Sequence, residues 1–136
     1  MLALYAGHAA AIETLRTLAE AWPARARAGE VPAARRMAAG TRTIAAVYGP
    51  LTPALRAALR GLHPALERWI VEHAYGRVLS RPGLGLRARE LVTVALLAQG
   101  GWERQLAGHL VGARRAGASP REVAAMRRLG ERGATR

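Results

Sequence analysis

Glu90 and His109 are the residues whose types and positions could support acid–base chemistry. Glu90 directly precedes LVTVALLA (residues 91–98), a segment apolar all round that predicts a helix buried on most sides. His109 shares a helix face with an apolar stripe made of Trp102, Leu106, Leu110 and Ala113. A carboxylate that reached this imidazole across the helix pair would fix its tautomer and stabilise the imidazolium. The far ring nitrogen would then remain for proton transfer.

Each of these two residues also has a plainer interpretation. A glutamate in the first turn of a helix is favoured by the helix dipole alone. A histidine on an apolar stripe is more often a hydrogen-bonded core residue than a catalyst. The sequence leaves both interpretations open for Glu90 and His109.

Other groupings of polar residues give weaker signals. The segment ERWIVEHAYGRVLSRPG (residues 67–83) gathers the titratable side chains of Glu72, His73, Tyr75, Arg77 and Arg81. Exposed charged residues at the end of a helix would give the same pattern. The histidines at positions 8, 63, 73 and 109 lack the spacing of a helical metal motif. GLGLRA (residues 83–88) imitates a dinucleotide fingerprint, but no predicted strand precedes it. We therefore expect neither a metal nor a cofactor.

The amino-acid composition excludes several mechanisms. The chain has no Cys, Lys, Asp, Asn or Phe, and its only serines are Ser80 and Ser119. Without Cys there is no disulfide, thiol peroxidase or thiolate–zinc site, and without Lys there is no Schiff base or phosphate-loop lysine. Without Asp or a G-x-S-x-G motif, we do not expect a Ser-His-Asp hydrolase either.

The net charge of +12 raises the question of an acidic partner, such as nucleic acid or anionic lipid. The arginines are scattered, however, and no aromatic residues interleave with them to stack on bases. The compositional bias of a GC-rich genome would give the same excess of arginine over lysine. Nucleic-acid binding is therefore the third of our functional hypotheses.

The hydrophobic pattern predicts one all-helical domain. Apolar residues recur at helical spacing throughout, and no stretch alternates in the manner of a strand. The helices that we expect span residues 9–22, 33–47, 53–60, 64–79, 86–99, 102–116 and 119–130. No apolar run is long enough for a membrane span and no signal peptide is recognisable, so we expect a soluble cytoplasmic protein that contacts no membrane.

Turn and capping residues define the limits of these helices. Pro53 and Pro64 suit first helical positions, and SRPGLG (residues 80–85) predicts a turn. In AGASPREV (residues 116–123), Gly117 can end one helix in a left-handed conformation, and Ser119 with Glu122 forms a capping box that starts the next.

The segment HAYGRVLSRPGLGLRARELVTVALLAQGGWERQLAGHLVGARRAGASPREV (residues 73–123) resembles the carboxymuconolactone decarboxylase family. The resemblance rests on the R-P-G-L turn, the R-x-R-E-L-V-T-V-A-L-L helix, the histidine nineteen residues after Glu90, and the A-x-x-A-G-A-S-x-x-E-V ending. It extends more loosely to RRMAAGTRTIAAVYGP (residues 35–50). It implies a single-domain helical bundle that assembles as a homo-oligomer, a trimer or a hexamer.

The related alkylhydroperoxidase branch carries a Cys-x-x-Cys ahead of the histidine and uses a Glu and a His as a proton relay. In this match Glu90 takes the place of the relay carboxylate and His109 that of the distal histidine. The two cysteines fall on Trp102 and Gln105, and the histidine between them falls on Arg104. Neither replacement has a thiol, so the match excludes dithiol peroxidase activity.

The decarboxylase branch implies a cofactor-independent reaction on a small carboxylate or lactone. We assign His109 as the proton donor, Glu90 as its orienting partner, and Arg104 with Arg81 as holders of the substrate carboxylate. Trp102 and Gln105 are further candidates for substrate binding. The alternative is a catalytically silent, oligomeric member of the family that binds a small ligand.

The first residues resemble the family's usual last element. LYAGHAAAIETLRTL (residues 4–18) matches it through Tyr5 and Gly7. We therefore predict a circular permutation within a single domain (residues 1–136), with a permuted helix in 1–25, a linker in 26–36 and the family body in 37–136. Domain swapping, a remnant of a duplication and an ordinary amphipathic helix are the alternatives.

The permutation makes a prediction about the site as well as the topology. Residues 2–22 should pack beside the helix that begins at Ser119, in the same subunit or a neighbouring one. Tyr5 and His8 would then line a pocket near His109.

Overall fold

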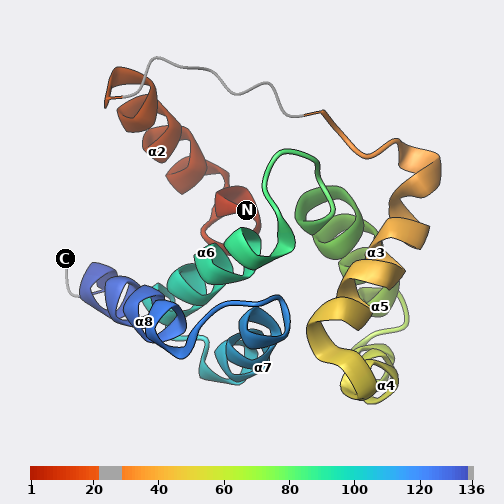
Figure 1. Cartoon of the computed structure of the whole chain (residues 1–136). Helices are drawn as coiled ribbons and strands as arrows, with labels where there is room; N and C mark the ends of the chain where they lie inside the picture. The colour runs from red at the N-terminus through yellow and green to blue at the C-terminus, as the bar shows by residue number, and fades with distance from the viewer. Residues whose placement is uncertain (22–28, 135–136) are drawn as a thin grey trace.

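The computed structural model describes residues 1–21 and 29–134, and within those ranges it is all helical, without a strand (Figure 1). The elements, in chain order, are α1 (Leu2–Tyr5), α2 (Gly7–Ala21), α3 (Ala33–Tyr48), the 3₁₀ turn η1 (Gly49–Leu51), α4 (Thr52–Leu62), α5 (Leu66–Trp69), the π-helix η2 (Ile70–Leu79), α6 (Leu86–Gln99), α7 (Glu103–Arg115) and α8 (Pro120–Ala134). The predicted all-α fold is confirmed. No helix in the described ranges has the length and apolar character needed to cross a membrane.

The predicted helix ends agree with the structure to within two residues, except that α8 continues past Gly130 to Ala134. One prediction was wrong in kind. The segment 64–79 is not a single α-helix, because His63 to Ala65 form a turn and the helix then widens into η2. The backbone N–H of Ser80 donates to Tyr75 O at 2.9 Å, an i to i+5 bond of the π type.

Helices α3 and η2 form one half of the bundle and approach each other unusually closely. A Cβ on Gly40 would lie 1.9 Å from Val71 O, and a Cβ on Gly76 would lie 2.1 Å from Arg36 O. Only glycine fits at these two crossings. The contact encloses a core made of Ile44, Val47, Val71, Tyr75 and Leu79.

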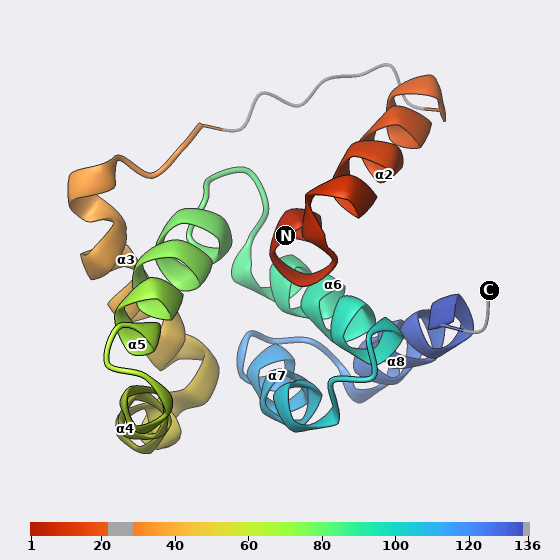
Figure 2. The same cartoon turned by 180° about the vertical axis from the view of Figure 1, so that it is seen from behind.

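Helices α6, α7 and α8 form the other half, around Val94, Leu97, Leu106, Ala113 and Val123. Figure 2 shows the two halves from behind, with α7 on the side of the second half that contacts α3. Arg115 of α7 spans the boundary, since its Nη1 donates to Val47 O at the end of α3 (3.2 Å). Glu90 and His109 lie along this boundary, where His109 faces Tyr48 at the end of α3.

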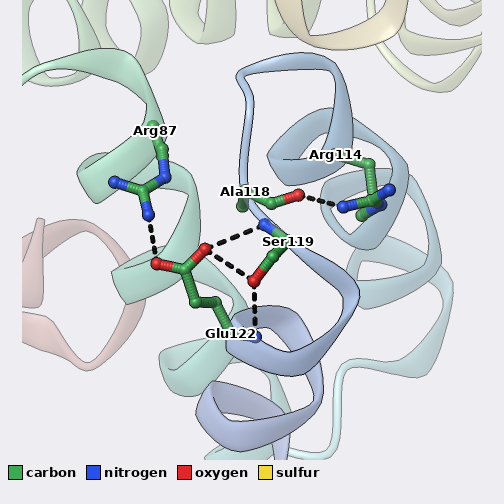
Figure 3. A network of polar contacts seen from close by, with 5 residues as sticks. All are labelled: Arg87, Arg114, Ala118, Ser119 and Glu122. Atoms are coloured by element: carbon green, nitrogen blue, oxygen red, sulfur yellow. Dashed lines mark hydrogen bonds and ion pairs between the residues drawn. The ribbon is translucent and has the colours of Figure 1, made fainter.

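The predicted capping box forms at the start of α8 (Figure 3). Glu122 N donates to Ser119 Oγ at 3.2 Å, and Ser119 N donates to Glu122 Oε2 at 2.8 Å. Gly117 has the left-handed conformation expected of it, with φ of +92°. Arg87 of α6 also donates to Glu122, and this bond, ahead of those from Ser119, lowers the pKa of Glu122 to about 2. The cap therefore also joins α8 to α6.

Arg89 holds the 80–85 turn against the first turn of α6. Its side chain is buried, and its guanidinium donates to the carbonyls of Val78, Arg81, Pro82 and Leu84. The turn thus wraps around a buried cation whose donors satisfy its backbone oxygens. Glu90 follows Arg89 on α6, so this packing also fixes the position of the candidate catalytic carboxylate.

Helices α1 and α2 differ in how they contact the rest of the bundle. Helix α1 lies beside α6, and Tyr5 packs against the core of α6 to α8. Helix α2 projects away from the bundle (Figures 1 and 2), and Ala11 is its only buried residue. The circular permutation stays a prediction. Residues 22–28, which include the end of the predicted permuted helix and the first three residues of its linker, lie outside the described residues, and Ala33 to Arg36 of the linker form the first turn of α3.

Candidate active site

Glu90 and His109 are in direct contact at the boundary between the two halves. Nδ1 of His109 lies 2.9 Å from Oε2 of Glu90. The Glu90 side chain is fully buried, and His109 is 4% exposed. The second turn of α6 supplies the carboxylate and the middle of α7 supplies the imidazole. The contact expected from the sequence is therefore present, in a position that excludes bulk water.

Two glycines on α7 make room for this pair. A Cβ on Gly112 would lie 2.7 Å from Glu90 Oε2 and 2.6 Å from Val47 Cγ1. A Cβ on Gly108 would lie 2.8 Å from the ring of Tyr48. Because these positions carry no side chain, both the carboxylate and the tyrosine ring can reach His109 from different sides.

The other ring nitrogen of His109 faces a tyrosine. Nε2 lies 3.4 Å from the hydroxyl of Tyr48, and Tyr75 donates to that hydroxyl at 3.3 Å. With Nδ1 carrying the hydrogen for Glu90, Nε2 accepts from Tyr48. The groups then form a chain with one direction of donation, from Tyr75 through Tyr48 and His109 to Glu90.

A third tyrosine, Tyr5, packs against His109. The ring of Tyr5 meets His109 edge to face, with centroids 6.4 Å apart, and Tyr48 does so at 5.8 Å. Burial raises the pKa of Tyr5, Tyr48 and Tyr75, and the carboxylate of Glu90 adds to the effect. All three hydroxyls therefore stay protonated at neutral pH and are available as donors.

One oxygen of the buried carboxylate has no partner. Oε2 of Glu90 binds His109, whereas Oε1 makes no hydrogen bond within the described residues. A buried carboxylate with a single hydrogen bond to an imidazole is suited to stabilising the protonated form of that ring. The contact occupies Nδ1 of His109 and leaves Nε2 as the ring nitrogen available for acid–base chemistry.

Comparison with known proteins gives the site its context. The model of the carboxymuconolactone decarboxylase family matches residues 64–132, just over half of the chain. The chain belongs to the carboxymuconolactone decarboxylase family. No curated protein matches it. The matched range contains Glu90, His109 and Tyr75, whereas Tyr48 and Tyr5 lie before it.

In this member of the decarboxylase family, the positions expected to hold substrate at the start of α7 are all exposed. They are Trp102, Arg104 and Gln105. The expectation that Trp102 lies in the buried stripe was wrong, since it is 57% exposed. It precedes α7, and its ring folds over Gly100, where a Cβ would lie 2.5 Å from Trp102 Cδ1. Gln105 lies one helical turn before His109, whereas Arg104 is roughly 140° around the helix from it.

Two further candidates line a hollow that includes neither Glu90 nor His109. Arg81 is exposed in the 80–85 turn, where its Nε donates to Gly29 O at 3.2 Å. His8 is exposed at the start of α2. Both line a hollow of about 320 Å³. The structure thus gathers Tyr5 with Glu90 and His109, and places His8 and Arg81 together elsewhere.

Sequence reasoning missed Tyr48 as a site residue and gave Tyr75 only a place among exposed charges. Tyr48 precedes His109 by 61 residues, and Tyr75 is buried in the π-helix. Their one local signal is a following glycine, in VYGP and HAYGR, which does not predict a shared hydrogen bond.

Proposed function

We propose that this family member decarboxylates a small carboxylated lactone without a cofactor, using His109 as the proton donor. The observation that supports the proposal is the buried 2.9 Å contact between His109 Nδ1 and Glu90 Oε2, with Nε2 turned toward Tyr48. The absence of cysteine in the chain removes the dithiol chemistry of the alkylhydroperoxidase branch. Acid–base chemistry is what remains for this pair.

The proposed reaction needs one proton and no external electrons. The bond between the lactone ring and its carboxylate breaks, carbon dioxide leaves, and the electron pair passes into the conjugated ring as a dienolate. Nε2 of protonated His109 then gives its proton to a ring carbon, and Glu90 stabilises the imidazolium beforehand. Exclusion of water strengthens both electrostatic steps.

Arg104 and Arg81 are the proposed holders of the substrate carboxylate. Neither is placed against His109: Arg104 projects from the exposed first turn of α7, and Arg81 lies in the 80–85 turn. Gln105, on the turn that precedes His109, is the better-placed candidate for orienting the lactone.

The test is turnover of carboxymuconolactone by the purified chain, followed by carbon dioxide release and by deuterium incorporation from D₂O. His109→Gln should lower kcat by about 10²-fold or more, because general acid catalysis contributes at least that much. The matched control is His63→Gln, since His63 is exposed and stacks on Trp69. Equal turnover by wild type and His109→Gln would reject the assignment.

A catalytically silent family member is the second candidate, and the position of a hollow away from His109 supports it. His109 is 4% exposed, and the hollow of about 520 Å³ is lined by residues of α1, α3, α5 and η2 instead. Absence of carbon dioxide release from the wild-type chain, with folding verified by circular dichroism, would support this second function.

A further inference from the structure

One hollow of the molecule lies away from His109. It measures about 520 Å³, within the usual range for small-molecule pockets. Its apolar walls are Leu4 of α1 with Trp69, Ile70 and Ala74 of α5 and η2. Trp69 is 59% exposed, so a large apolar surface stands open at this site. Such a surface suits the apolar body of a ligand.

Two arginines, Arg36 and Arg77, line the hollow. Glu72 lines it as well, and its Oε2 lies 3.4 Å from Nε of Arg68. A second hollow of about 320 Å³ adjoins it, because Leu4, His73 and Arg77 line both. The second hollow adds further basic groups, namely His8, Arg81 and Arg89. The combination of apolar walls and a basic edge favours a ligand with an apolar body and an anionic end.

A carboxylate of the chain itself already lies between the two arginines. Oε2 of Glu30 is 3.6 Å from Arg36 Nη2, and Oε1 is 3.7 Å from Arg77 Nη2. Both distances exceed those of a good hydrogen bond, and Glu30 is 54% exposed, so these are weak contacts. Arg36 is held in place independently, since its Nε donates to Val31 O at 3.1 Å.

We propose that this hollow binds a small carboxylate with an aromatic or aliphatic body. The ligand carboxylate replaces Glu30 between Arg36 and Arg77, and its body packs on Leu4, Ile70 and Trp69. The site shares none of its lining residues with the Glu90–His109 pair. It therefore stands whether or not the decarboxylase proposal holds.

The probe is phenylacetate, and 2-phenylethanol is its neutral counterpart, both titrated by calorimetry. Phenylacetate should bind at least about tenfold more tightly, because a guanidinium–carboxylate bond contributes on the order of that factor. Arg77→Gln should remove this advantage. Glu30→Gln should raise the affinity for phenylacetate severalfold and leave that for 2-phenylethanol unchanged, because it removes the competing carboxylate.

The controls separate this site from the others. Arg60→Gln is the matched change at an exposed arginine of α4 that pairs with Glu67, and it should not alter binding. His109→Gln should not alter it either. Equal affinity for the two probes would overturn the proposal, as would a Glu30→Gln variant that binds phenylacetate no better than the wild type. Failure of phenylacetate to bind, together with a lower assembly mass for Arg77→Gln in light scattering, would instead assign the hollow to an acidic side chain of a second copy.

Discussion

His109 has a different partner at each ring nitrogen, and this asymmetry determines which nitrogen can serve a substrate. Glu90 takes Nδ1 within a buried contact, so that nitrogen is committed to structure and charge stabilisation. Nε2 meets Tyr48, a side chain that is half-buried and therefore closer to solvent than the imidazole. In the proposed reaction, the hydroxyl of Tyr48 would position the nitrogen that donates the proton.

Tyr48→Phe tests this role. The variant keeps the ring that packs beside His109 but removes the hydroxyl that faces Nε2. We expect kcat for lactone decarboxylation to fall by about tenfold with KM nearly unchanged, because one hydrogen bond to a group that becomes charged is lost. The measurement is steady-state kinetics.

The control for that variant is Tyr75→Phe, which removes the donor to Tyr48 and leaves the contact with His109 in place. It should lower kcat less. A purely structural role for Tyr48 would show instead as a lowered melting temperature with unchanged kcat.

Among the elements, the 80–85 turn depends on one side chain of α6. Arg89 is 5% exposed and donates to four carbonyls, those of Val78, Arg81, Pro82 and Leu84. Burial, with the neighbouring Arg81 second, lowers the pKa of Arg89 from its ordinary value, but a guanidinium stays charged throughout the physiological range. The turn and the start of α6 are therefore coupled through a cation.

Arg89→Met should destabilise the chain by about 2–4 kcal/mol, since it removes the hydrogen bonds of a buried guanidinium to four backbone carbonyls. Urea unfolding followed by circular dichroism measures the loss. Arg87→Met is the matched control on the same helix, because Arg87 is exposed and pairs with Glu122 at the surface, and its effect should be clearly smaller. Equal losses in both variants would contradict the structural role of Arg89.

Local signals were enough to predict most elements and the acid–base pair. Helical spacing placed Glu90 and His109 on neighbouring helices, and the capping box located the start of α8. The π-helix was missed because its apolar spacing resembles that of an α-helix, and its packing on α3 depends on Gly40 and Gly76, far apart in sequence. Tyr48 was missed because its hydrogen-bond partner, His109, lies 61 residues away in the sequence.

The whole molecule combines a large positive charge with an unpartnered apolar helix face. The chain carries +12, and α2 presents Ile12, Leu15 and Leu18 at 56%, 61% and 47% exposure. The proposed permutation predicts that this helix packs beside α8 of the same or a neighbouring subunit, and within this chain it projects away from the bundle (Figure 1). A neighbouring subunit is the partner that would reconcile this prediction with the position of α2.

Assembly should therefore depend on α2 and on salt. We expect the chain, of 14.5 kDa, to form a homo-oligomer whose population grows with ionic strength, because salt screens repulsion between subunits of like charge. The triple variant Ile12→Gln, Leu15→Gln and Leu18→Gln should shift the mass in light scattering toward that of a single chain. Leu62→Gln, at a residue 77% exposed on α4, is the control and should leave the mass unchanged. An unchanged mass for the triple variant would rule out α2 as the assembly surface and leave the permuted helix without its proposed partner.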